Sequence, residues 1–347
     1  PEYQHFTHFH ASDTGLSFPV VGAMAEDKAG NIWICTEGGG LNLYQPEQER
    51  FKHFNLRTGY HFSTDYLKDI VFDEANNCLW IAADFTNKIN CFHLDNYRND
   101  IYNLESSEEG KIGEALFALA DTPRRLYIGT TLAVVSLDKQ TLKSEILFHE
   151  KELFTHNYNT LLLDSKNRLW FASDEGCIAY ILDEHRFETY KINLRKKVRS
   201  QKELVNVIYE DRSGDIWVGT RWQALYRLDR NGQVKQIFSD HNYLLGAVYH
   251  IMEDKDGNLW FSTKGNGLVK AEPDMNSPHG LRFTRYKNDP KDSNSISNND
   301  VYFTYQDSQE RIWVGLLGGG LNLIAEENGE VVFKHKYNGL KQYPPYG

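Results

Sequence analysis

The sequence predicts an all-β protein, a seven-bladed β-propeller built from four-stranded antiparallel blades. Three observations favour this fold class. A motif with the pattern D-x-x-G-x-[IL]-W recurs along the 347 residues. No segment shows the sustained apolar period of 3.6 residues that an amphipathic helix requires. Aromatic residues make up 13% of the chain, and flat side chains pack well on pleated sheets.

The motif is most complete at 27–36, 211–220 and 254–263, and its aromatic position recurs at intervals of 43 to 53 residues. A repeat of that length supplies four strands. One such sheet cannot bury both of its faces, so the blades must stack on one another. We therefore interpret the recurrent aromatic residues as buried structural anchors between blades rather than as ligand contacts. These anchors are Trp33, Trp80, Tyr127, Trp170, Trp217, Trp260 and Trp313.

Each repeat has the pattern of four strands. An apolar strand ends at the motif aspartate, which caps a tight turn whose glycine takes a positive φ. The second strand carries the anchor, a glycine-rich step such as 38–40 precedes the third, and the fourth contains spaced aromatic residues. We expect one domain over 1–347, with blades at approximately 16–56, 63–106, 112–150, 156–195, 203–241, 245–288 and 297–338.

The two ends of the chain both resemble a fourth strand, at 3–9 and 331–337, although only one is needed. We predict that the N-terminal strand 3–9 closes the ring against the last repeat, which removes an open sheet edge, and that the C-terminal one is surplus. Residues 340–347 resemble the opening of a further repeat, so the chain is expected to be a fragment of a longer one.

Charge and composition exclude several classes of partner. The net charge of −10 argues against nucleic acid and anionic lipid, which both bind basic surfaces. No run of 18 apolar residues is present, so we expect this segment to make no direct contact with a membrane. The four cysteines, Cys35, Cys78, Cys91 and Cys177, form no C-x-x-C pair, and we interpret them as buried thiols.

The repeat resembles that of the two-component regulator propeller family. The resemblance rests on D-x-x-G-x-[IL]-W-[IV]-G-T, then G-G-L-N, then F-x-x-Y, and it is closest at 283–322 and in the opening stretch 15–42. The second and third repeats depart from it, because 76–77 and 123–125 lack the turn glycine.

This resemblance implies the periplasmic sensor region of a hybrid two-component system of gut bacteria. In that family two propellers precede a small β-sandwich, a membrane helix and the histidine kinase and response-regulator modules. The family senses carbohydrate fragments and controls polysaccharide-utilisation genes. The resemblance implies an oligosaccharide ligand. It also implies a second propeller and C-terminal modules of the same chain as partners, and it allows a homodimer.

Known catalytic patterns are absent from the sequence. It contains no H-E-x-x-H, G-x-S-x-G, P-loop or dinucleotide-binding glycine pattern, so we predict no catalytic residue, no metal and no cofactor. His5, His8 and His10 alternate with aromatic residues, which fits an edge strand better than a metal site. His250 falls on a predicted first strand, where some propeller lyases carry catalytic groups, but it has no partner in the pattern.

A ligand is expected at the loops between second and third strands and between blades, because these emerge on one face. Arg221 and Trp222 replace the glycine-rich step of the fifth repeat, and Tyr243, Tyr60, His61 and Tyr158 lie in inter-blade loops. Aromatic faces stack on sugar C–H surfaces, and polar tips orient the ligand. Alternatively, Trp222 covers its loop or packs against a second propeller. The basic run at 195–202 fits either a solvated loop or a site for an anionic glycan.

Three functions fit these patterns. The first is a sensor module that binds an oligosaccharide and passes a change in geometry to a kinase. The second is a propeller enzyme, a lyase or glycan-cleaving relative, which predicts several catalytic side chains converging on one site. The third is a protein-interaction scaffold, which predicts a large apolar patch. We favour the sensor and expect no enzymatic activity in this segment.

Overall fold

The computed structural model describes residues 9, 11–104, 111–149, 161–173, 176–190, 205–221, 224–239, 245–277, 279–338 and 340. Their strands form seven four-stranded antiparallel sheets, and the strand order within each sheet follows the chain. The fold class is the predicted seven-bladed β-propeller. Helix is limited to two short 3₁₀ turns in the described residues, η2 (Pro46–Gln48) and η3 (Leu56–Thr58).

The blades have the following strands. The first three contain β1 (Val21–Glu26), β2 (Ile32–Thr36), β3 (Gly40–Gln45), β4 (Arg50–Phe54), β5 (Leu67–Asp73), β6 (Cys78–Ala83), β7 (Lys88–His93), β8 (Asn99–Asn103), β9 (Leu116–Asp121), β10 (Arg125–Thr130), β11 (Ala133–Asp138) and β12 (Ser144–His149). The fourth and fifth contain β13 (Leu161–Leu163), β14 (Arg168–Ser173), β15 (Gly176–Ile181), β16 (Arg186–Tyr190), β17 (Val205–Glu210), β18 (Ile216–Thr220), β19 (Ala224–Leu228) and β20 (Val234–Ser239). The last two contain β21 (Ala247–Glu253), β22 (Leu259–Lys264), β23 (Leu268–Pro273), β24 (Leu281–Tyr286), β25 (Val301–Gln306), β26 (Ile312–Leu316), β27 (Gly320–Glu327) and β28 (Glu330–Lys334).

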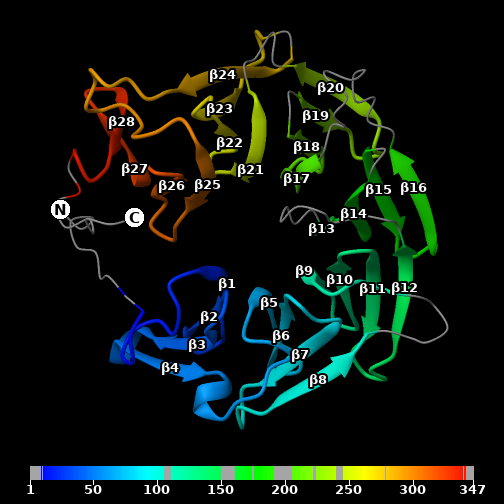
Figure 1. Ribbon diagram of the computed structural model, residues 1–347. Helices are drawn as coiled ribbons and strands as arrows, with labels where there is room; N and C mark the ends of the chain where they lie inside the picture. The colour runs from blue at the N-terminus through cyan, green and yellow to red at the C-terminus, as the bar shows by residue number, and fades with distance from the viewer. Residues whose placement is uncertain are drawn as a thin grey trace. The chain divides into compact units, whose positions relative to one another are not determined.

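Backbone contacts group these blades into two compact units, Phe9–Leu163 and Asp164–Gly347, where the sequence predicts one domain. Within the first unit the first strands β1, β5 and β9 lie on one side and the fourth strands β4, β8 and β12 on the other (Figure 1). Within the second unit β17, β21 and β25 follow one another in the same way (Figure 1).

The last blade is completed by the chain's C-terminal strand. β28 pairs with β27 in antiparallel register, from Leu323 opposite Lys334 to Glu327 opposite Glu330, and occupies the fourth position of its sheet. The prediction that this strand is surplus is therefore wrong. Ring closure by residues 3–9 concerns a segment of which only Phe9 lies among the described residues. The Phe9 ring contacts those of Tyr44 and Phe51 in the first blade, both at 4.8 Å.

The recurring motif folds as a turn organised by its aspartate. In the fifth blade, one Asp211 oxygen accepts hydrogen bonds from the amides of Ser213 (2.9 Å) and Asp215 (3.0 Å). The other accepts one from the Trp217 indole at 2.7 Å. Gly214 takes a φ of 79°, where a Cβ would be strained. The aspartate thus ties the turn to the anchor ring of the second strand.

The indole bond recurs in every described repeat that has a tryptophan anchor. The six indole-to-carboxylate distances run from 2.7 to 3.2 Å, at Trp33, Trp80, Trp170, Trp217, Trp260 and Trp313. The second repeat keeps this geometry without the turn glycine, because Asn77 adopts a left-handed φ of 48°. Asparagine tolerates that region better than most residues.

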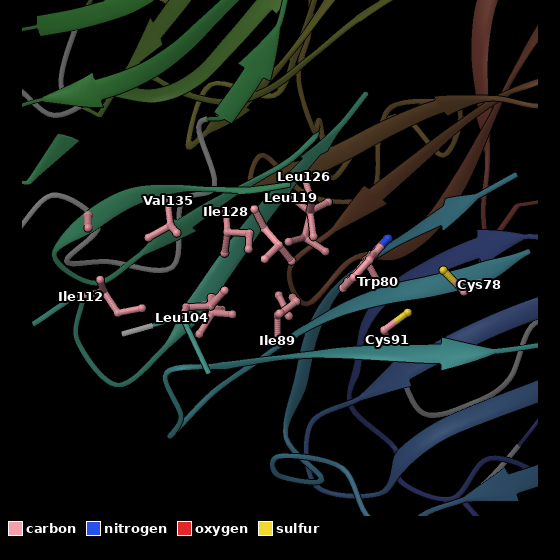
Figure 2. Close-up of a cluster of buried hydrophobic side chains, with 14 residues drawn as sticks. Cys78, Trp80, Ile89, Cys91, Leu104, Ile112, Leu119, Leu126, Ile128 and Val135 are labelled. Carbon is pink, nitrogen blue, oxygen red and sulfur yellow. The ribbon is translucent and has the colours of Figure 1, made fainter. Parts of the chain in front are cut away.

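Several anchor rings also pack against the following blade, whereas Trp313, predicted to be buried, is half-buried. Trp33 lies 5.6 Å from Phe92 of the second blade, and Trp217 lies 5.5 Å from Phe261 of the sixth. Trp80 belongs to a buried cluster that joins β6 and β7 to the third blade, through Leu119 and Leu126 (Figure 2). Large flat rings therefore fill the space between successive sheets of a unit, where apolar burial contributes most.

The third repeat replaces the missing indole with a lysine. Its anchor is Tyr127, and its aspartate is Asp121, whose carboxylate is bound by the Lys139 ammonium at 3.0 Å. The same ammonium binds Asp73, the motif aspartate of the second blade, at 2.7 Å, and both the Lys139 and Asp73 side chains are 2% exposed. One buried cation thereby links two neighbouring turns.

In two first strands a titratable side chain accepts a hydrogen bond from a backbone amide of the next blade. Asp69 in β5 accepts from the Leu119 amide at 2.8 Å, and His250 in β21 accepts from the Thr304 amide at 3.5 Å. Each lies two residues before the one that pairs with the anchor tryptophan, so the positions are equivalent. Burial raises the pKa of Asp69 from 3.8 to about 6 and lowers that of His250 from 6.5 to about 4.

Replacing Asp69 by asparagine should change how stability depends on pH. Between about pH 4 and 6 the folded chain keeps a proton on Asp69 that the unfolded chain releases, so stability falls as the pH rises through this window. The D69N variant lacks this loss. Between pH 4.5 and 7 the free energy of unfolding of D69N, measured with urea, should therefore rise relative to that of the unaltered chain by on the order of 2 kcal/mol. An equal difference at both pH values would show that Asp69 does not titrate in this way.

The remaining sequence expectations concern cysteines and membrane segments. All four cysteines are buried and free, as expected. No helix in the described part of the chain is long and apolar enough to cross a membrane.

Candidate functional site

A pocket of ≈ 640 Å³ lies at the motif turns of the second unit. It is formed by the turns between first and second strands in the fourth, fifth and sixth blades, together with the β19–β20 turn. These turns lie at the opposite strand ends from the loops where the sequence predicts a ligand. The lining residues are Ser165, Lys166, Tyr209, Glu210, Asp211, Arg212, Gly214, Arg230 and Glu253.

The pocket walls are held together by hydrogen bonds between blades. In the last three blades the residue that precedes the motif aspartate accepts a bond from the turn of the preceding blade. Glu210 accepts from the Ser165 amide at 2.8 Å, Glu253 from the Arg212 amide at 2.7 Å, and Gln306 from the Lys255 amide at 2.8 Å. This bond repeats at three successive blade junctions, so it fixes the spacing of the turns that surround the pocket.

The charged groups of the pocket are balanced and mostly engaged. The Arg212 guanidinium pairs with Glu253 at 2.6 Å, and the Lys166 ammonium donates to the Arg230 carbonyl at 2.8 Å. Burial raises the pKa of Tyr209, which therefore stays protonated at neutral pH. The lining set offers hydrogen-bond donors and acceptors but includes no histidine or cysteine. It is suited to holding a polar ligand or a protein surface, and it lacks the nucleophile–histidine pair of many hydrolases.

Two of the predicted ligand residues lie in the first unit. The Tyr60 ring is half-buried and contacts Phe54 at 4.8 Å and Phe92 at 6.5 Å, within the core between the first two blades. His61 is exposed, and its carbonyl accepts a bond from the Asn99 amide group at 2.9 Å. Tyr60 therefore supports packing, while the His61 side chain is available to solvent.

Of the other predicted ligand residues, only Arg221 lies among the residues that the structure describes. Arg221 is half-buried directly after β18, in the second unit. Trp222, Tyr243 and Tyr158 lie outside the described residues, as do the basic run at 195–202 and the histidines at positions 5, 8 and 10. No group of three or more histidine, cysteine or acidic side chains suited to a metal occurs among the residues that the structure covers.

His250 does not have the surroundings of a catalytic base. Its Nδ1 accepts the Thr304 amide, and its ring lies 4.4 Å from that of Phe303. With its pKa lowered to about 4 by burial, the imidazole is neutral at physiological pH. Its contacts tie the sixth blade to the seventh.

The repeats match a known family model. The family described as two-component regulator propeller matches residues 15–38, 201–222 and 242–265, and each segment includes part of one motif repeat. Three repeats of the chain therefore match the two-component regulator propeller repeat. Their aspartate–indole turns are the structural form that this repeat takes in the protein.

Three known proteins show what this propeller is similar to. A protein named histidine kinase P4 from Formosa agariphila is 24% identical over 315 residues, which cover 83% of this chain and 22% of that protein. The extracellular domain of a hybrid two-component system from B. thetaiotaomicron matches with a TM-score of 0.60 and 20% identity, over 89% of this chain and 40% of that one. The extracellular domain of a one-component system from the same organism matches with a TM-score of 0.63 and 22% identity, over 94% and 40%.

The propeller is short compared with these proteins. It spans about a fifth of the curated relative and two fifths of the two solved chains. At these identities the solved structures support the fold of this chain alone.

Proposed function

We propose that this propeller is the extracytoplasmic sensing module of a signal-transduction receptor and binds an oligosaccharide without cleaving it. The observation that carries the proposal is the family repeat, together with a relative named as a histidine kinase. The two similar solved structures, which are named as extracellular domains of signalling systems, support a location outside the cytoplasm, and we propose the periplasm.

The proposed receptor continues beyond this propeller. A second propeller and C-terminal modules of the same chain would carry the signal to a linked histidine kinase, which would control a polysaccharide-utilisation response. A ligand shifts a conformational equilibrium only by binding one state more tightly than the other. The blade-to-blade bonds at Glu210, Glu253 and Gln306 hold the blades of the second unit together, so we place the change in the packing of propellers or of two protomers.

Titration calorimetry on the 347-residue chain tests this proposal. We expect heat of binding with at least one tri- to hexasaccharide from a panel of neutral and uronic-acid types, and intact saccharide in the mixture by mass spectrometry afterwards. Arg221→Ala, at the loop face predicted from sequence, reports whether that face takes part. Shortened saccharides would favour a propeller enzyme instead, and no binding to any member of the panel would contradict the proposal.

A further inference from the structure

The second blade carries two of the four cysteines on neighbouring strands of its sheet. Cys78 is the first residue of β6, and Cys91 lies in β7. Cys78 is opposite His93 and Cys91 is opposite Trp80, so the two cysteines are diagonal neighbours across this strand pair. Both side chains belong to the buried cluster around Trp80 (Figure 2). The two thiols therefore share one face of the sheet.

The two sulfur atoms are in contact. The side chains converge from their two strands with the sulfurs toward one another (Figure 2). A hydrogen bond with the Cys78 thiol, and then burial, raises the pKa of the Cys91 thiol well above its usual range. Cys78 is 1% and Cys91 4% exposed, so the surrounding core holds them in place. Sulfurs that already touch need little backbone movement to reach the geometry of a disulfide.

The same two positions are joined by side chains in other blades. In the third blade Arg125 donates to the Ser136 hydroxyl at 2.7 Å, and in the fifth Arg227 binds Asp215 at 2.7 Å. Each pair has the register of the two cysteines, with one residue two before the anchor and the other opposite the anchor. The repeat therefore directs these two side chains toward one another.

The second blade departs from the repeat at both positions together. Two residues before the anchor, the other repeats have polar side chains: Asn31, Arg125, Arg168, Asp215, Asn258 and Arg311. Opposite the anchor they have Leu43, Ser136, Ala179, Arg227, Lys270 and Leu323. Cysteine stands at neither position in any other blade and at both positions in this one. The fold does not require it, so the pair calls for a role of the two thiols together.

We propose that Cys78 and Cys91 form a disulfide bond when the chain folds outside the cytoplasm. This location is that of the proposed function, and disulfides form and persist in oxidising compartments. The bond joins β6 to β7 at the foot of the β5–β6 turn, because Cys78 pairs with Asp73, which begins that turn. This turn lacks the motif glycine, so the bond supports the blade where the repeat is least regular.

The oxidant is itself a disulfide, that of a thiol–disulfide oxidoreductase in the cell or of oxidised glutathione in vitro. One cysteine thiolate attacks the oxidant and displaces one of its sulfurs as a thiolate. The other cysteine then attacks the mixed disulfide and releases the second sulfur. The two cysteines together lose two electrons and two protons, which convert the oxidant into two thiols. Because the buried Cys91 thiol stays protonated, this exchange takes place before the second blade has packed.

Refolding of the reduced, denatured chain in a buffer of oxidised and reduced glutathione tests this bond. Free thiols are then blocked under denaturing conditions, and tryptic peptides are analysed by mass spectrometry without reduction. The two cysteines fall in separate tryptic peptides, 69–88 and 89–98. We expect these peptides to be linked in most chains and to separate on addition of dithiothreitol. Cys91→Ala should abolish the link, whereas the matched control Cys177→Ala, at an equally buried thiol, should retain it.

The other two cysteines provide an internal comparison in the unaltered chain. Cys35 and Cys177 are also buried, and each is the one cysteine of its blade, so we expect both as blocked thiols. Recovery of Cys78 and Cys91 as blocked thiols, as glutathione adducts or linked to Cys35 or Cys177 would overturn the proposed bond. That result would leave the proposed function standing, because no saccharide enters this experiment. A chain that forms the bond but binds no saccharide loses the proposed function alone.

Discussion

Replacement of Lys139 by methionine is expected to lower the free energy of unfolding by about 3–5 kcal/mol. Lys139 is the cation shared by Asp73 and Asp121, and its side chain and that of Asp73 are each 2% exposed. Removing one partner of a buried ion pair leaves the other charges without compensation in a poorly solvated site. Here a single substitution affects two turns, in the second and third blades.

The matched control for this variant is Lys255→Met. Lys255 also pairs with a carboxylate, Glu310, but the two side chains are 47% and 59% exposed. Exposed pairs contribute little, so its loss should cost no more than about 1 kcal/mol. Denaturant unfolding of both variants checks the expectation. Similar small losses in the two would mean that Lys139 is not the cation that supports these turns.

Truncation of Trp217 to alanine is the second change with a large expected effect, a loss of about 3–5 kcal/mol. Its side chain is fully buried, stacks on Phe238 at 5.7 Å and contacts Phe261 of the next blade. The substitution opens a cavity between two sheets and removes the indole that binds Asp211.

Two further variants separate these contributions. Trp217→Phe keeps an aromatic ring but not the bond to Asp211, so it should cost about 1–3 kcal/mol and less than alanine. Tyr337→Ala, at a side chain that is 78% exposed, should change stability by no more than about 0.5 kcal/mol. If alanine and phenylalanine at position 217 were equally mild, the ring would not be a structural wedge.

The repeat pattern was enough to predict the fold class, because one buried ring and one turn per blade must recur wherever a sheet stacks on the next. It did not reveal that the aspartate binds the indole, although the separation of the two residues, six in five of the six tryptophan repeats and seven in the second, was a signal for it. Nor did it reveal Lys139. That lysine compensates for Tyr127 through a contact between blades, which no local pattern records.

The candidate sites were harder to predict for a physical reason. The pocket at Glu210 and Glu253 is built from turn residues, which a repeat pattern assigns to structure. At the loop face, Tyr60 is predicted as a ligand contact from its place in an inter-blade loop. Its partly buried ring also packs against the core between the first two blades, and its contact with a ligand stays a prediction.

Diffraction from crystals grown with the tightest-binding saccharide of the calorimetric panel tests most directly that this propeller holds an intact saccharide. We predict density for an uncleaved saccharide bound to the propeller. Density for cleavage products alone, or crystals without any bound saccharide, would contradict that prediction.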